Sequence, residues 1–130
     1  MPLTEIREIF GKDNFSSLLG INIDSAESGH AVVSVEIEKK HINGNNVVQG
    51  GVVFTLADFS CAVAANADEM SYVTADGNIS YYAPAVCKKL IAEARVLKHG
   101  KTLAFCETTI KDETGKIIAK ANFTMCRNKQ

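Results

Sequence analysis

The long apolar segment at residues 51–66, GVVFTLADFSCAVAAN, most constrains the fold. It contains no proline, and its length and its Ala and Leu content favour a helix over a strand. Because it is hydrophobic on nearly all sides, we expect this helix to be buried. Small residues at intervals along it would let another backbone approach closely, as when a curved sheet wraps a helix. These are Ala57, Ser60, Cys61, Ala64 and Ala65.

Alternating patterns on both sides of this segment predict strands. Residues 21–37 are typical of a hairpin with its turn at residues 27–29. The last third of the chain predicts four more strands, at residues 72–82, 90–97, 103–110 and 117–125. Residues 1–19 carry a short amphipathic pattern broken at Gly11, which predicts an N-terminal segment of one or two small helices. The predicted class is α+β, with a curved antiparallel sheet around one buried helix.

The length and charge of the chain limit the number of domains and the kinds of partner that we expect. The chain has 130 residues, so we expect residues 1–130 to form a single domain. With 14 Lys and Arg against 15 Asp and Glu, no overall field draws the protein to nucleic acid or anionic lipid, and we expect neither as a partner. Four widely spaced cysteines without a CxxC pair predict reduced core thiols, no metal site and a cytoplasmic location.

Gly50 and Gly51 stand where the predicted helix begins. A helix start offers backbone N–H groups without intrahelical partners, together with the positive end of the helix dipole. Such an end can hold an oxyanion, and glycine lets a ligand carbonyl approach the backbone. An isolated Gly-Gly pair is also a common turn, so the pair alone does not establish a site.

Asp58 is a carboxylate in the middle of the apolar segment. Burying an unpaired charge is costly, so the group must be paired, neutralised or used. Its position is equally compatible with catalysis and with a structural role, as a loop cap or the partner of a lysine. Gly50 and Asp58 lie roughly 12 Å apart along one helix, too far for one substrate carbon to touch both. If both serve one reaction, the helices of two subunits must pair across a two-fold axis.

The string HINGNNVVQGGVVFTLAD, with the later DGNISYYAP and LKHGKTLAF, resembles the hot-dog-fold acyl-CoA thioesterases of the phenylacetic-acid-degradation type. The resemblance covers nearly the whole chain from Ile21 onward, and its most specific element is GGxxFxLxD. It implies a hot-dog fold that forms a dimer or a dimer of dimers, and we expect a homotetramer. It also implies hydrolysis of an acyl-CoA, with aryl and phenylacetyl types among the candidates, to a free acid and coenzyme A. Coenzyme A is then part of the substrate, and no other cofactor is expected.

The resemblance also implies roles for individual residues. Gly50 corresponds to the backbone N–H donor that polarises the thioester carbonyl, and Asn43 to a side chain that assists on the same subunit. Asp58 corresponds to the catalytic carboxylate supplied by the partner subunit, as general base or as nucleophile. Thr74 stands where the family has a hydroxyl that holds the attacking water. Together these residues would supply an oxyanion donor, a base and a group that orients water.

Gln49 departs from the family pattern, which most often has His directly before the two glycines. Gln can donate and accept hydrogen bonds but cannot take up a proton near neutral pH. If the family His must titrate, this protein would be slow or inactive. We expect Gln49 to orient groups by hydrogen bonding instead, because Asp58 already supplies the base.

The stretch KHGKT at residues 98–102 resembles the family's turn near the phosphates and pantetheine of coenzyme A. Lys98 and Lys101 flank Gly100, with Thr102 following, and would supply local positive charge that the chain lacks overall. For either lysine taken singly, a solvated hairpin turn is an equally good interpretation.

Two other functions stay open at this point. A hot-dog domain that binds acyl-CoA as a sensor or scaffold would account for Gln49, but it leaves the Asp58 carboxylate without a purpose. A hot-dog hydratase needs a His with an acidic partner, which the central helix does not offer. Several aromatic residues could line an acyl pocket, but aromatic residues are more often core, so none is assigned a role. These are Phe54, Phe59, Tyr81, Tyr82 and Phe105.

Overall fold

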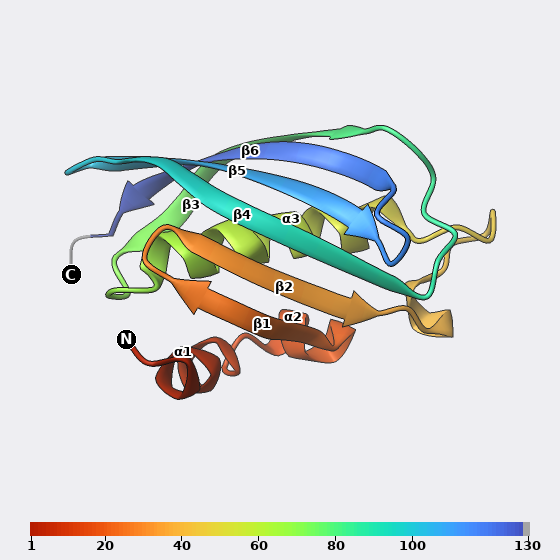
Figure 1. The fold of residues 1–130 in the computed structure, drawn as a ribbon, viewed down its shortest axis with the longest axis horizontal. Coiled ribbons are helices and arrows are strands. Elements are labelled where there is room, and N and C mark those ends of the chain that lie inside the picture. Colours follow the sequence, from red (N-terminus) through yellow and green to blue (C-terminus); the bar gives the residue numbers. More distant parts are fainter. Residues whose placement is uncertain (129–130) are drawn as a thin grey trace.

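A curved antiparallel sheet wraps one long helix in this computed structural model (Figure 1). Within residues 1–128, which the structure describes, the sheet has six strands in the order β1-β2-β4-β5-β6-β3. The strands are β1 (Ile21–Glu27), β2 (His30–Glu36), β3 (Tyr72–Tyr81), β4 (Lys89–His99), β5 (Leu103–Asp112) and β6 (Ile117–Arg127). The α+β hot-dog architecture expected from the sequence is confirmed, with strand ends that differ from the prediction by no more than two residues.

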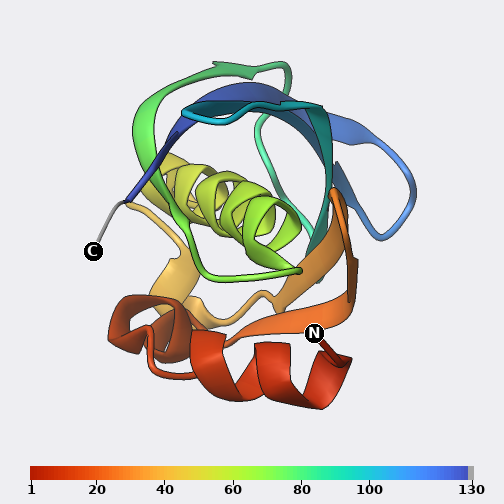
Figure 2. The same cartoon turned by 90° about the vertical axis from the view of Figure 1, so that its left-hand side faces the viewer.

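The central helix α3 (Gly50–Asn66) lies inside the curve of the sheet, as the view along it shows (Figure 2). It begins one residue earlier than the pattern predicts, so both glycines belong to its first turn. Ala57, Cys61 and Ala64 are completely buried, as expected for small residues beneath a closely packed sheet. A hydroxyl in this core is also satisfied, because Ser60 Oγ donates to Thr108 Oγ1 of β5 at 2.9 Å.

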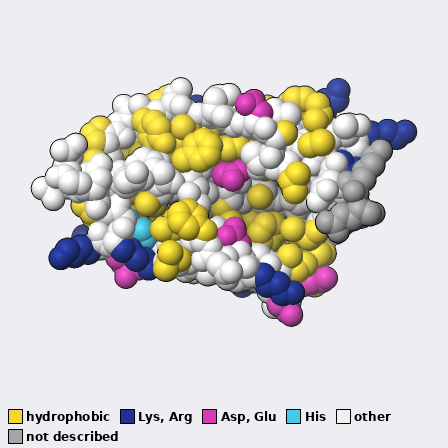
Figure 3. Space-filling model, turned by 180° about the vertical axis from the view of Figure 1, so that it is seen from behind, with side chains coloured by type: hydrophobic (Ala, Val, Ile, Leu, Met, Phe, Trp, Pro, Cys, Tyr) yellow, Lys and Arg dark blue, Asp and Glu magenta, His cyan; other side chains and the backbone are white. Residues whose placement is uncertain are grey.

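One stripe of α3 stays open in the single chain. Gly51 is exposed, and Thr55, Asp58 and Ala62 are half-buried. Spacings of three and four residues put these positions on one face of a helix. The expectation that the whole helix is buried is therefore wrong for this face. On the side of the molecule opposite to that of Figure 1, hydrophobic side chains surround isolated acidic ones (Figure 3).

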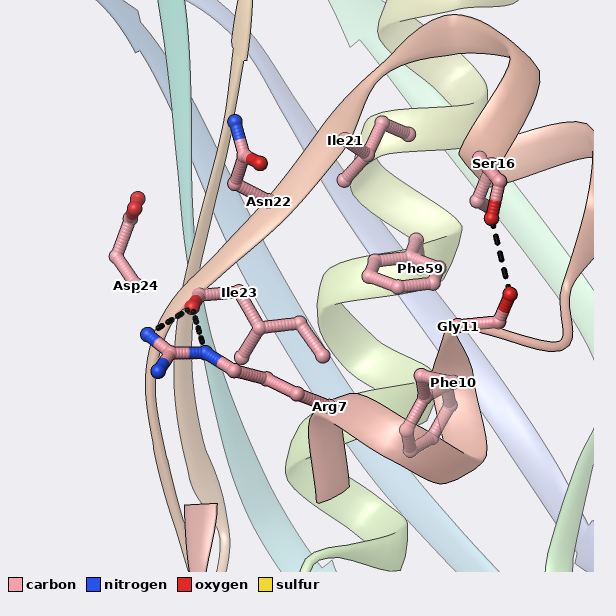
Figure 4. Close-up of a pocket in the computed structure, with 10 residues that line it drawn as sticks. Arg7, Phe10, Gly11, Ser16, Ile21, Asn22, Ile23, Asp24 and Phe59 are labelled. Carbon is pink, nitrogen blue, oxygen red and sulfur yellow. Dashed lines mark hydrogen bonds between the residues drawn. The ribbon is translucent and has the colours of Figure 1, made fainter. Parts of the chain in front are cut away.

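Two short helices, α1 (Leu3–Phe10) and α2 (Asn14–Leu19), pack beneath α3, as predicted for the N-terminal segment (Figure 2). The ring of Phe10 meets that of Phe59 edge-on, with centroids 5.5 Å apart. A hollow of about 470 Å³ lies between these helices, β1 and α3 (Figure 4). At its edge the Arg7 guanidinium donates to the Ile23 carbonyl oxygen through Nε at 3.0 Å and Nη2 at 2.8 Å. The N-terminal segment is thus fastened to the first strand.

The four cysteines are all free. Cys61 and Cys106 are buried in the core, whereas Cys87 and Cys126 are half-buried, so the description as core thiols fits only two of them. Burial raises the pKa of the Cys61 thiol, which keeps it protonated and unreactive near neutral pH. In the part of the chain that is described, no helix is both long and apolar enough to span a bilayer.

Candidate active site

Asp58 and Thr74 form the first half of the candidate site. Thr74 Oγ1 donates a hydrogen bond to Asp58 Oδ1 at 2.7 Å. Thr74 precedes a bulge in β3, where the register against β6 shifts between Thr74 and Asp76. A bulge re-aims side chains relative to a regular strand, and this one occurs where the strand passes the middle of α3. The residues predicted to be the base and the hydroxyl that holds the attacking water are therefore in direct contact.

The environment of Asp58 makes its carboxylate more basic. Burial raises the pKa of this carboxyl above its ordinary value, and the Thr74 hydroxyl opposes the effect by stabilising the charged form. The negative charge of Asp13 raises the pKa further. Within residues 1–128 neither a lysine nor a backbone N–H pairs with Asp58, so both structural roles considered for it are missing. Its second oxygen, Oδ2, has no donor in this part of the chain and is free for a water or a substrate.

The first turn of α3 forms the second half. Among the described residues, the Gly50 N–H has no hydrogen-bond acceptor, whereas the Gly51 N–H donates to the side-chain oxygen of Gln49. The free N–H lies at the positive end of the helix dipole. A fixed donor of this kind can stabilise negative charge that develops on a carbonyl oxygen. The donor that the sequence assigned to this site is thus available.

Gln49 and Asn43 shape the backbone that leads into α3. Gln49 is the N-cap of the helix, and its side-chain oxygen accepts from the Gly51 N–H, so its orienting role toward a substrate stays a prediction. The side-chain oxygen of Asn43 accepts from the N–H groups of Asn45 at 2.9 Å and Val47 at 3.3 Å. Because that oxygen holds the loop, only the amide NH₂ of Asn43 is left to assist a ligand.

A buried histidine anchors the same loop. His41 Nδ1 accepts from the Glu38 N–H at 2.8 Å, which leaves Nε2 as the donor to the Leu19 carbonyl oxygen, also at 2.8 Å. The side chain is fully buried, so it cannot reach a substrate. In the sequence, His41 is only the first residue of the string HINGNNVVQGG. In the structure, it holds the loop before α3 against the end of α2.

A pocket of about 300 Å³ opens beside Gly50, between the start of α3 and the end of β3. Val48, Val53 and Ile118 contribute apolar walls. Tyr81 also lines it, and its hydroxyl donates to the Gly50 carbonyl oxygen at 2.8 Å. Sequence reasoning left Tyr81 without a role, because no local pattern shows that the last residue of β3 meets the first residue of α3.

Lys98, Gly100, Lys101 and Thr102 lie at the turn between β4 and β5. The strand β4 runs to His99, two residues past its predicted end at 97, so Lys98 belongs to the strand and only residues 100–102 form the turn. Both lysines are exposed, and neither has an ion-pair partner within residues 1–128. A side chain on Gly100 would collide with the backbone, since its Cβ would lie 2.5 Å from the Leu103 carbonyl oxygen. The glycine is therefore required by the shape of the turn.

Tyr72 and Arg127 hold this turn in place, and sequence reasoning missed both. The Tyr72 hydroxyl donates to the Gly100 carbonyl oxygen at 2.7 Å, and Arg127 Nε donates to that of Lys101 at 2.7 Å. The Arg127 guanidinium also lies 4.7 Å from the centroid of the Tyr72 ring. No motif marks these residues, which the pairing of β3 with β6 brings together.

Comparison with known proteins decides the family. The profile of the Thioesterase superfamily matches residues 45–119, a span that holds Gly50, Asp58 and Thr74 and more than half of the chain. The chain belongs to the thioesterase superfamily. It is a thioester hydrolase, as expected from the sequence.

Individual relatives agree with this assignment. This thioesterase is 35% identical over 116 residues to human acyl-coenzyme A thioesterase 13, which covers 85% of this chain and 83% of the human protein. The structure of E. coli PaaI, from the phenylacetic acid degradation operon, is similar with a TM-score of 0.88 and 27% identity, over 95% of this chain and 90% of that one. The Streptococcus mutans protein smu.793, solved bound to acetyl CoA, has a TM-score of 0.77 and 26% identity, over 85% and 90% of the two chains.

Removing the Thr74 hydroxyl from this thioesterase should move its pH profile. The hydroxyl stabilises ionised Asp58, so Thr74→Val raises the pKa of that carboxyl further. If Asp58 must be ionised to act, the acid limb of the kcat/KM profile shifts to higher pH. The measurement is the pH dependence of thioester hydrolysis, with Thr109→Val, which removes a hydroxyl from β5, as the control. A limb that stays in place or moves to lower pH would contradict this coupling.

Proposed function

We propose that this thioesterase hydrolyses acyl-CoA thioesters to a free acid and coenzyme A, at sites that two subunits build together. The observation that carries the proposal is the split site. Asp58 lies in the middle of α3, in contact with Thr74 of β3, and the free Gly50 N–H stands roughly 12 Å away at the start of the helix. Support also comes from the name of the human relative, an acyl-coenzyme A thioesterase, and from the S. mutans neighbour solved bound to acetyl CoA.

A second copy of the chain would complete the site. If two α3 helices pack antiparallel along the open stripe, Asp58 of each faces Gly50 of the other, and the small residues of the stripe let the helices approach. The strand β3 lies at an edge of the sheet, where its unpaired backbone groups can pair with a second β3. One isologous interface then produces two equivalent sites. We expect such homodimers to pair further into a homotetramer.

The chemistry follows from these positions. The thioester carbonyl oxygen accepts a hydrogen bond from the Gly50 N–H, which stabilises the charge that forms as the carbonyl carbon becomes tetrahedral. Asp58 of the partner subunit removes a proton from a water, and the water oxygen attacks that carbon. Collapse of the intermediate breaks the C–S bond, the thiolate of coenzyme A takes up the proton, and the free acid leaves. The reaction requires no metal and no redox cofactor.

The raised pKa of Asp58 favours the general-base route over direct attack. A more basic carboxylate accepts a proton more readily near neutral pH. Thr74 holds Oδ1 and leaves Oδ2 to face the water. In the nucleophilic route the carboxylate itself would form a mixed anhydride. If water then attacks the aspartyl carbon of that anhydride, hydrolysis in ¹⁸O-labelled water places label in Asp58.

Loss of the Asp58 charge should abolish most turnover without harming the fold. For Asp58→Asn we predict a fall in kcat of about 10²- to 10⁴-fold, the usual contribution of a positioned base. Folding raises the pKa of Asp58, so binding of a proton to this carboxyl stabilises the folded state at low pH. That contribution to the free energy of unfolding is lost as the pH rises through the folded-state pKa. At pH 7 the asparagine should therefore not lower the melting temperature.

Thiol release from a panel of short, long and aryl acyl-CoAs measures this effect and finds the preferred acyl group. A fully active Asp58→Asn protein would eliminate the proposed base. Saturable binding of acyl-CoA without thiol release by the wild type would favour the sensor function that Gln49 suggests.

Mixing two inactive variants tests whether each site uses two subunits. Gly50→Pro removes the N–H but suits the helix start, because proline is favoured at the first helical position. Gln49 already has the extended backbone that precedes proline, with φ −62° and ψ 133°. In a heterodimer of Gly50→Pro and Asp58→Asn chains, one site carries both changes and the other carries neither. The purified heterodimer should therefore recover about half of the wild-type rate.

The matched control for this experiment is Gly50→Ala. It keeps the N–H and adds a Cβ that meets the Tyr81 hydroxyl at 3.4 Å, an ordinary contact distance. It should retain more activity than Gly50→Pro, since only the proline lacks the donor. A heterodimer that recovers no activity would argue for a site within one chain.

The β4–β5 turn should matter only for substrates that carry the nucleotide of coenzyme A. We predict that Lys98→Gln and Lys101→Gln each raise KM for acyl-CoA roughly two- to fivefold, the size of an exposed ion pair. The KM for the matching acyl-pantetheine thioester, which lacks the nucleotide phosphates, should not change. Lys116→Gln, at the exposed turn between β5 and β6, serves as the control. Equal effects on both thioesters would point to a structural role for the turn.

A further inference from the structure

Tyr81 joins the last residue of the edge strand β3 to the first residue of α3. Its hydroxyl donates to the Gly50 carbonyl oxygen at 2.8 Å across 31 positions of sequence, although the side chain is 51% exposed. Burial of the hydroxyl end raises its pKa, so it remains a donor at neutral and mildly alkaline pH. An exposed tyrosine that keeps a tertiary hydrogen bond to a glycine backbone is not explained by core packing.

The peptide group between Gly50 and Gly51 is held at both of its polar ends. Tyr81 binds its carbonyl oxygen, and the side-chain oxygen of Gln49 accepts from its N–H. The preceding peptide is held through the Gln49 carbonyl oxygen, which accepts from the Val52 N–H at 2.9 Å. Of the N–H groups of Gly50, Gly51 and Val52, that of Gly50 alone has no acceptor within residues 1–128. The surrounding contacts therefore determine the direction in which it points.

A Gly-Gly helix start needs such restraint. Glycine has more backbone freedom than any other residue, and helix ends are where backbones fray. A donor that must meet a developing oxyanion loses much of its value if it is free to turn away. The Tyr81 ring also lies against Gly50, with Cζ 3.5 Å from where a Cβ would be, and walls the adjoining pocket.

We propose that Tyr81 is a positioning residue, whose hydroxyl fixes the Gly50–Gly51 peptide so that the Gly50 N–H is aimed at the thioester oxygen. The inference rests on the proposed function of Gly50 in thioester hydrolysis. Tyr81 does not contact the reacting atoms, and it acts only through the backbone that it holds. It should therefore affect the transition state more than the binding of substrate.

Tyr81→Phe tests this directly, because it removes the hydroxyl and keeps the ring. We expect kcat to fall about tenfold, less than complete loss of an oxyanion donor, while KM stays within about twofold. Binding of a non-hydrolysable thioether analogue of acyl-CoA should be unchanged. Ser80→Ala, which removes a hydroxyl from the neighbouring exposed position on the other face of β3, should retain wild-type kcat.

A second readout does not depend on turnover. In ¹⁵N relaxation measurements the Gly50 and Gly51 amides should be more mobile in Tyr81→Phe than in the wild type and Ser80→Ala. An unchanged kcat would overturn the inference, as would parallel losses of kcat, analogue binding and melting temperature, which mark a purely structural tyrosine. If the wild type hydrolyses no acyl-CoA, the proposed function fails. The mobility of the Gly50 and Gly51 amides is then the only test of whether Tyr81 holds this peptide. Equal mobility in Tyr81→Phe and the wild type would overturn the inference.

Discussion

The packing of α3 into the concave face of the sheet is the interaction on which the rest of the structure depends. The helix packs mainly against β2, β4 and β5, and its small residues let the sheet come near enough to exclude water. This fixes the rotation of the helix about its own axis. The face that carries Asp58 consequently lies beside the edge strand β3 rather than beneath the centre of the sheet, and both the candidate site and the proposed interface follow from that orientation.

The polar side chains buried on α3 differ from the half-buried Asp58 in how they are bonded. Ser60 donates within the core, and Asn66 makes four hydrogen bonds that end the helix, two of them with the backbone of Tyr72. No buried side-chain nitrogen or oxygen in residues 1–128 lacks a partner. Among the polar side chains of α3, only Asp58 has an oxygen that makes no hydrogen bond within this part of the chain, and it lies on the open stripe. Because the other polar side chains of this helix are hydrogen-bonded, we interpret the free oxygen of Asp58 as functional.

The sequence alone predicted those helices and strands that follow from local patterns of apolar and polar residues. Alternation predicted the strands, and a long apolar segment without proline predicted α3, although its start at Gly50 came one residue early. The partial exposure of Asp58 was not predictable, since hydrophobicity along a helix does not reveal where a sheet ends. Contacts such as Tyr81 with Gly50 and Arg127 with Tyr72 join residues distant in sequence, and no local pattern records them. Resemblance to a family placed Asp58 and Thr74 in one site, but the direct hydrogen bond between them was not predicted.

The bulge in β3 has a consequence for how the site can change over time. Thr74 lies before the bulge and reaches one half of the site, while Tyr81 lies beyond it and reaches the other half. In an unbroken strand a slip of one residue would turn every side chain to the opposite face. The bulge lies between the Thr74 and Tyr81 contacts. An insertion or deletion at one end of β3 can therefore be accommodated at the bulge, and the other end keeps its register against β6. The two ends of β3 can therefore change independently. Substitutions around Thr74 can alter the polarity near Asp58 while the contact of Tyr81 with Gly50 is kept.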